Sequence, residues 1–75
     1  MPEATRQIAR AIKGLMAERG VTQQQIANAI DRTQGYVSER ANGLDAWNTA
    51  ELELIAKRLG FADAFDLLAE VTRRR

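Results

Sequence analysis

Polar side chains that can pair with nucleic-acid bases cluster between Gln23 and Gly43. The amide of Gln34 can bond bidentately to adenine N6 and N7, and the carboxylate of Glu39 can accept from cytosine N4. Gly35, beside Gln34, has no side chain and would let the backbone approach a ligand closely. These residue types could recognise a nucleic acid without any covalent chemistry.

Catalytic chemistry has little support in this sequence. The chain has no histidine and no cysteine, which excludes a His-based triad and thiol chemistry and leaves only carboxylates as zinc ligands. Asp63 and Asp66 could share a helix face, but no base, nucleophile or metal ligand accompanies them. We interpret them as a solvated acidic face that the helix dipole favours. We therefore expect no enzyme, no cofactor and no small-molecule ligand.

Length and composition indicate one small globular domain over residues 1–75. Apolar residues make up 45% of the chain and charged residues 28%, which are ordinary globular values. Residues 1–44 carry six basic and four acidic groups, whereas residues 45–70 carry two basic and six acidic groups. The basic N-terminal half permits an anionic partner there. We expect a cytoplasmic protein with no membrane association, because no apolar run could span a bilayer and no signal-peptide pattern occurs.

The elements that must position the polar residues are helices. Apolar residues at positions i, i+4, i+7 and i+8 predict a first helix over residues 3–19, with a stripe of Ile8, Ile12, Leu15 and Met16. Gly20 stands where a C-terminal glycine would end this helix. Thr22 and Gln25 then have the spacing of a capping box, which opens a second helix.

A third, short helix is predicted from Gln34 to about Asn42, with Thr33 as its N-cap. The second and third helices would share a buried contact made by Ile26, Ala27, Ile30 and Val37. Ala27 is small where the two helices would cross at a steep angle. Residues 23–43 therefore predict a helix-turn-helix, whose second helix enters the major groove of DNA.

Two further helices complete the predicted all-α fold. Asn48 and Glu51 have the spacing of another cap, and Trp47 and Leu52 occupy the positions of a hydrophobic staple. This fourth helix ends at Gly60, and a fifth helix is predicted from about residue 62 to residue 72. The periodicity predicts five helices and no sheet.

The sequence resembles the lambda-repressor/Cro-like helix-turn-helix family, also called the XRE family. The resemblance covers about residues 8–61 and rests on Thr22-Gln23, Ile26-Ala27, Ile30, Thr33-Gln34, Val37-Ser38, Asn42-Gly43 and the segment LELIAKRLG from Leu52 to Gly60. It implies a compact five-helix, lambda-repressor-like domain that binds a double-stranded DNA operator, as small phage or prophage-type regulators do.

Three positions depart from the family pattern. Asp31 stands where the turn usually has a glycine with positive φ, which aspartate tolerates. Arg32 replaces a common apolar turn residue. Arg40 replaces an apolar residue late in the third helix, so it leaves the helix less firmly seated or is free to reach a phosphate.

The residues expected to contact bases are Gln34, Gly35, Tyr36, Ser38 and Glu39. We expect Tyr36 to face outward, where it contacts a thymine methyl or a phosphate. Simpler alternatives are a solvated glutamine at position 34, a tolerated glycine at position 35, and a local pair between Glu39 and Arg40.

The residues expected to contact the DNA backbone are Gln23, Arg32, Thr33, Arg40, Asn42 and Lys13. For Gln23 and Asn42 this role is implied by the resemblance. Thr33 is a cap in either case, and the cap alone would explain it. Such contacts position a protein without specifying sequence.

The predicted fifth helix is more apolar than a core requires. Phe61, Phe65 and Leu68 form one stripe, and Ala64, Leu67 and Val71 form another. We expect a homodimer, with Ala64, Leu67 and Val71 as candidate dimer contacts; the alternative is one broad buried stripe in a monomer. Residues 73–75 are expected to be a frayed, solvated tail, or else a non-specific phosphate arm.

These features favour a transcriptional regulator, most simply a repressor that occupies an operator as a dimer through residues 34–42. One alternative is the antitoxin and autorepressor of a toxin–antitoxin pair. Another is a protein-interaction module, such as an anti-repressor, on the same fold.

Overall fold

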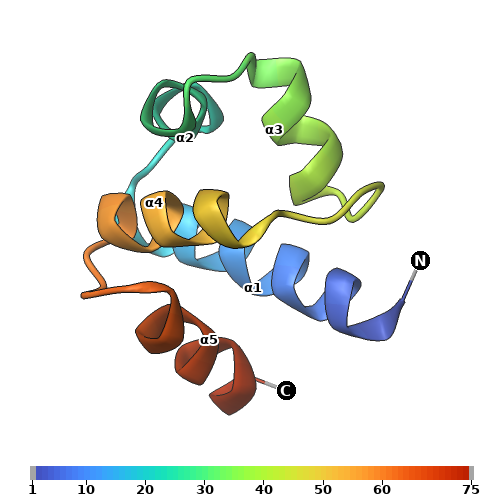
Figure 1. Cartoon of the computed structure of the whole chain (residues 1–75), viewed down its shortest axis with the longest axis vertical. Coiled ribbons are helices and arrows are strands. Elements are labelled where there is room, and N and C mark those ends of the chain that lie inside the picture. The colour runs from blue at the N-terminus through green and yellow to red at the C-terminus, as the bar shows by residue number, and fades with distance from the viewer. Residues whose placement is uncertain (1, 75) are drawn as a thin grey trace.

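The computed structural model describes residues 2–74, which form five helices and no strand. In chain order these are α1 (Glu3–Arg19), α2 (Gln23–Ile30), α3 (Gln34–Ala41), α4 (Thr49–Leu59) and α5 (Ala64–Arg73). In the view of Figure 1, α2 and α3 lie on one side of α1 and α4, and α5 lies on the other side. The prediction of an all-α, five-helix chain is confirmed.

A single hydrophobic cluster joins all five helices. Its largest fully buried side chains are Ile12, Leu15, Ile26, Val37, Ile55 and Leu67. Ala27 is completely buried as well, which agrees with the prediction that this small residue lies where α2 and α3 cross. Because a chain of this size buries only about 60% of its unfolded surface, a core shared by all the helices is needed for stability.

The predicted helix ends are also found. Gly20 and Gly60 are left-handed, with φ of 67° and 99°, a conformation that glycine adopts without steric cost. The Thr22 hydroxyl accepts from Gln25 N at 3.1 Å, and Gln25 Oε1 accepts from Thr22 N at 2.9 Å. Asn48 begins α4 with a second capping box. These contacts satisfy N–H groups that a helix start otherwise leaves unpaired.

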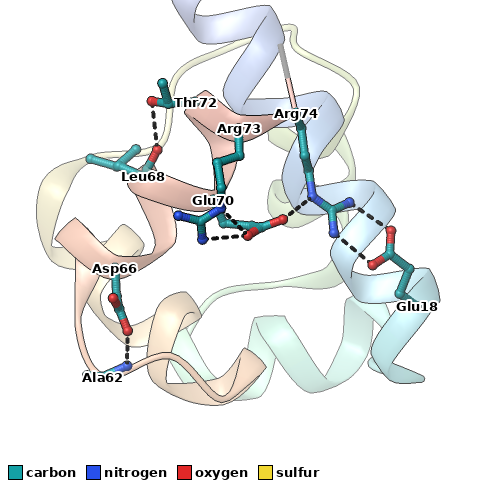
Figure 2. Close-up of polar contacts among 8 residues, drawn as sticks. All are labelled: Glu18, Ala62, Asp66, Leu68, Glu70, Thr72, Arg73 and Arg74. Carbon is teal, nitrogen blue, oxygen red and sulfur yellow. Dashed lines mark hydrogen bonds and ion pairs between the residues drawn. The ribbon is translucent and has the colours of Figure 1, made fainter.

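The start of α5 differs from the prediction by two residues. The Asp63 carboxylate accepts from Asp66 N at 2.9 Å and caps the helix, so the helix begins at Ala64. Asp66 Oδ2 in turn accepts from Ala62 N at 3.3 Å (Figure 2). The two aspartates are therefore reciprocal caps, and the interpretation of them as a merely solvated face was incomplete.

The C-terminal end of α5 is tied to α1 rather than frayed. Arg73 belongs to α5 and pairs with Glu70 at 2.7 Å. Two nitrogens of the Arg74 guanidinium each lie 2.7 Å from a different carboxylate oxygen of Glu18, and its Nε lies 2.9 Å from Glu70 (Figure 2). The expectation of a loose tail is therefore wrong for Arg73 and Arg74, because carboxylates of Glu18 and Glu70 hold them; residue 75 lies outside the described residues.

These ion pairs lower the pKa values of the two carboxyl groups that take part in them. The hydrogen bond from Arg74 lowers the pKa of the Glu18 carboxyl, and those from Arg73 and then Arg74 lower the pKa of Glu70. The Arg74 guanidinium passes close to Gly14 of α1, where a Cβ would lie 3.5 Å from Arg74 Nη1, an ordinary contact distance.

Candidate nucleic-acid interface

The turn between α2 and α3 fixes the direction of α3. Asp31 takes the left-handed conformation expected for it, with φ of 57°. Arg32 N donates to Ala27 O at 2.9 Å, and the Thr33 hydroxyl accepts from Tyr36 N at 3.2 Å. This side-chain cap stabilises the first turn of α3.

One face of α3 is anchored and the opposite face is free. Val37 and Ala41 are buried against the core. At 3.6 residues per turn, Gly35 and Glu39 lie opposite Val37 and Ala41, Ser38 lies beside them, and Gln34 is in the first turn on the side of Val37. Gln34, Gly35 and Glu39 are exposed and Ser38 is partly exposed. Four of the five residues expected to contact bases therefore form one surface, which we call the α3 face.

Tyr36 lies beside the α3 face and turns toward α4. It is half-buried, and its hydroxyl donates to Glu51 Oε2. This hydrogen bond raises the pKa of the tyrosine. The guanidinium carbons of Arg40 and Arg32 lie 3.4 and 4.9 Å from the ring centroid, within the range of a cation–π interaction. The expectation that Tyr36 faces outward is therefore wrong, because its hydroxyl donates to the buried carboxylate of Glu51.

Arg40 is also packed and not free. Its side chain is only 13% exposed. The guanidinium stacks on Tyr36, lies 3.2 Å from Asp45 Oδ2, and donates to Tyr36 O at 3.4 Å. Arg40 thus fills the place of an apolar residue, and the exposed carboxylate of Asp45 pairs with its charge. The expectations of a loosely seated helix and of an arginine free to reach a phosphate are therefore both wrong.

Glu51, which the sequence predicts only as part of a helix cap, also contacts the start of α3. Its Oε1 accepts from Asn48 N at 3.0 Å, while its Oε2 accepts from Tyr36 and lies 4.0 Å from Arg32 Nε. One buried carboxylate therefore closes the start of α4 and holds the start of α3. The capping-box spacing revealed the first role, and no local signal could reveal a contact across fifteen positions.

The other residues expected to contact the DNA backbone are accessible to solvent. Gln23, the first residue of α2, is partly exposed, and Arg32, Thr33, Asn42 and Lys13 are exposed. Lys13 Nζ donates to Asn42 Oδ1 at 2.9 Å, so α1 and the end of α3 present these two side chains together. Arg32 and Thr33 border an open hollow of about 470 Å³ beside the start of α3.

The candidate dimer contacts on α5 face the core instead. Ala64, Leu67 and Val71 are 7%, 0% and 6% exposed, whereas Phe65 is 83% exposed. The assignment of this stripe to a second copy was therefore wrong, because it is the stripe that α1 and α4 cover. Phe61 and Leu68 are partly buried at the edge of the core.

Two other kinds of site are missing from the part of the chain that the structure describes. Within residues 2–74, no three His, Cys, Asp or Glu side chains gather as a metal site would require. No helix in this range has the length and apolar composition needed to cross a membrane.

The fold and the α3 face define a helix-turn-helix domain. Two solved structures are similar to this chain, both crystal structures of the clp gene regulator ClgR from Corynebacterium glutamicum. One is 26% identical with a TM-score of 0.84, covering 97% of this chain and 77% of that chain. The other is 26% identical with a TM-score of 0.81, covering 99% and 95%. No protein-family model and no curated protein matches the chain.

Proposed function

We propose that this protein is a sequence-specific, double-stranded-DNA-binding transcriptional regulator that reads an operator with α3. The observation that carries the proposal is a short helix, capped at Thr33 and anchored by Val37, with a polar outer face. Its similarity to a gene regulator along nearly the whole chain supports the same conclusion. Repression of a lambda-repressor/Cro-like kind, by occupancy of the operator, is the simplest mode of action.

The α3 face supplies the groups that a base edge requires. The Gln34 amide pairs with adenine, and the Glu39 carboxylate accepts from the amino group of cytosine. Gly35 lets the backbone approach the groove, because a Cβ there would meet only the Thr33 hydroxyl, at 3.9 Å. Ser38 adds a hydroxyl on the same surface. Tyr36 and Arg40 act as positioning residues, since the Tyr36 hydroxyl is bonded to α4 and Nη2 of Arg40 is paired with Asp45 in the loop that follows α3.

Backbone contacts flank this face and set the register of α3 in the groove. Gln23 and Thr33 stand at the starts of the two helices of the motif, Arg32 lies in the turn, and the Lys13–Asn42 pair lies at the far end. Because the net charge of the chain is only +1, non-specific binding should be weak at physiological salt.

Dimerisation of the protein is proposed to use the outer face of α5. Phe65 is the most exposed large apolar side chain of the described residues. The first half of α5 carries Asp66 and its last residue is Arg73. A two-fold axis across the helix would set the acidic end of one copy against the basic end of its partner. Such an interface uses the same patch twice, as closed dimers do.

Sedimentation equilibrium tests the dimer. Phe65→Glu should be monomeric, whereas Leu54→Glu, which introduces the same charge at an exposed leucine of α4, should remain dimeric. If both variants or neither variant dissociated, the assignment of the α5 face would be wrong.

Selection of bound duplexes from a randomised library tests the DNA-binding function. We expect a two-fold symmetric site with half-sites about 34 Å apart on one face of the DNA. Gln34→Ala should relax the preference at one base pair of each half-site. Gln7→Ala, which removes an amide from α1 on the side that faces α5, should not. Failure to enrich any sequence would refute the proposal and favour the protein-interaction module.

A further inference from the structure

A second basic surface lies beside the end of α3, and it is concave. The N-terminal half of α1 passes next to the C-terminal end of α3 (Figure 1), and between them is a hollow of about 230 Å³. The residues that line it are Arg6, Ala9, Arg10, Lys13, Ala41 and Asn42. We call it the α1–α3 hollow.

The charges of this hollow are unbalanced. Arg6, Arg10 and Lys13 recur at i, i+4 and i+7, so they form one stripe along α1. Among residues 2–74, no carboxylate lines the hollow. Glu3 pairs with Arg6 at 2.8 Å, but both side chains are more than half exposed, so the pair compensates little of the charge. Lys13 is engaged by the neutral amide of Asn42. Three cations therefore face a space with no built-in anion.

The backbone around Gly43 holds the two sides of the hollow together. A Cβ at Gly43 would lie 3.6 Å from Arg6 Cγ and 3.9 Å from Ala9 Cβ. Ala9 and Ala41 are almost completely buried and form the floor. The carbonyls of Ser38, Glu39 and Arg40, in the last turn of α3, accept hydrogen bonds from the N–H groups of residues 42–44, which reduces the negative field of this helix end.

The position of the hollow indicates its ligand. It adjoins the end of the helix whose polar face reads the bases, and its three cations are exposed to solvent. A DNA strand bordering the groove that α3 occupies would pass this end. A small free anion would need donors enclosing it, whereas a phosphodiester already positioned by α3 needs only cations within reach.

We infer that the α1–α3 hollow binds a backbone phosphate of the DNA, with Arg6 and Arg10 as phosphate ligands and Lys13 and Asn42 at its edge. This inference rests on the proposed function and assigns two arginines that the sequence reasoning counted only toward the net charge. Such a contact would add affinity equally at all sequences.

The test compares two charge-matched double variants. R6Q/R10Q removes both guanidinium groups from the hollow but keeps the Cβ and Cγ of residue 6 against Gly43. K57Q/R58Q removes two exposed cations from α4, so both variants change the net charge from +1 to −1. Circular dichroism of each variant confirms that it is folded. The dissociation constant is then measured between 50 and 300 mM NaCl on the selected operator and on an unrelated duplex.

The slope of log K against log salt should become shallower by about 0.9 for R6Q/R10Q, the value expected when one phosphate is no longer neutralised. If the affinities of the variant and of the unaltered chain are equal at 1 M salt, a slope change of about 0.9 makes the variant bind about eightfold more weakly at 0.1 M salt. The effect should be equal on both duplexes, and the K57Q/R58Q slope should be unchanged.

An unchanged slope for R6Q/R10Q would overturn the assignment of the hollow and leave the proposed function standing. Equal slopes for both double variants, each shallower than the original, would also overturn it, since net charge alone would then explain the result. Absence of any DNA binding by the unaltered chain would refute the proposed function as well.

Discussion

Leu67 and Phe65 are two residues apart on α5, yet the structure predicts opposite consequences for their removal. Leu67 is completely buried and Phe65 is 83% exposed. Leu67→Ala removes a core side chain and leaves a cavity, which costs about 3–5 kcal/mol. Phe65→Ala removes a side chain that mostly contacts water, so it should change the unfolding free energy of the monomer by less than about 0.5 kcal/mol.

The size of the domain makes this difference easy to measure. At about 0.05–0.15 kcal/mol per residue, 75 residues have a total unfolding free energy of roughly 4–11 kcal/mol. Leu67→Ala would therefore remove about a quarter or more of the stability. Since each kcal/mol shifts Tm by about 4–8 °C in a domain of this length, its Tm should fall by at least about 12 °C, and the variant should be much closer to unfolding at physiological temperature.

Urea and thermal unfolding followed by circular dichroism provide the measurement. The protein concentration is kept low enough for sedimentation to show a monomer, because dimerisation would itself raise Tm. Phe65→Ala should instead weaken self-association at higher concentration. If Phe65→Ala destabilised the monomer as much as Leu67→Ala, the assignment of the two faces of α5 would be refuted.

Three further predictions concern the turn, the cap and the C-terminal ion pairs. Asp31→Ala should destabilise the protein by about 1 kcal/mol because of the left-handed conformation, and Asp31→Gly should not, as urea titration of both variants will show. Thr33→Ala should cost about 1 kcal/mol through loss of the cap on α3, and weaken operator binding beyond what Thr33→Ser does in the same titration. The pKa of Glu18 is lowered from its usual 4.5, so its contribution to stability is present above pH 4.5 and is lost as pH falls through the lowered pKa. Tm measured from pH 7 to pH 2 should therefore fall less steeply for Glu18→Gln than for the unaltered chain; equal slopes would contradict the ion pair with Arg74.

The helix boundaries could be predicted from sequence because the interactions that set them are local. A capping box joins residues three positions apart, and a terminal glycine acts on its own turn. The structure therefore has the predicted N-caps at Thr22 and Asn48 and the predicted helix ends at Gly20 and Gly60. The start of α5 was misplaced because Asp63 and Asp66 were interpreted as surface charge and not as caps.

The candidate site was predictable to the extent that it follows helical periodicity. Val37 anchors α3, so Gly35 and Glu39, which lie opposite it, must point outward. Ser38 lies beside them, and Gln34, three residues before Val37, is exposed at the first position of the helix. Tyr36 and Arg40 lie at the border between the two faces, where periodicity gives no answer. Their orientation depends on Glu51 and Asp45, which belong to a later helix and to a loop.

The five helices, the N-caps of α2, α3 and α4 and the exposed polar residues of α3 could be predicted from the amino-acid sequence, because each depends on residues within about one turn of each other. Which apolar stripe of α5 is buried depends on helix packing, since both stripes are hydrophobic and the choice is made by what α1 and α4 present. Helix packing likewise decided that Arg74 pairs with Glu18, and that three cations of α1 meet the end of α3. Contacts between residues tens of positions apart depend on how helices pack, and no local spacing encodes them.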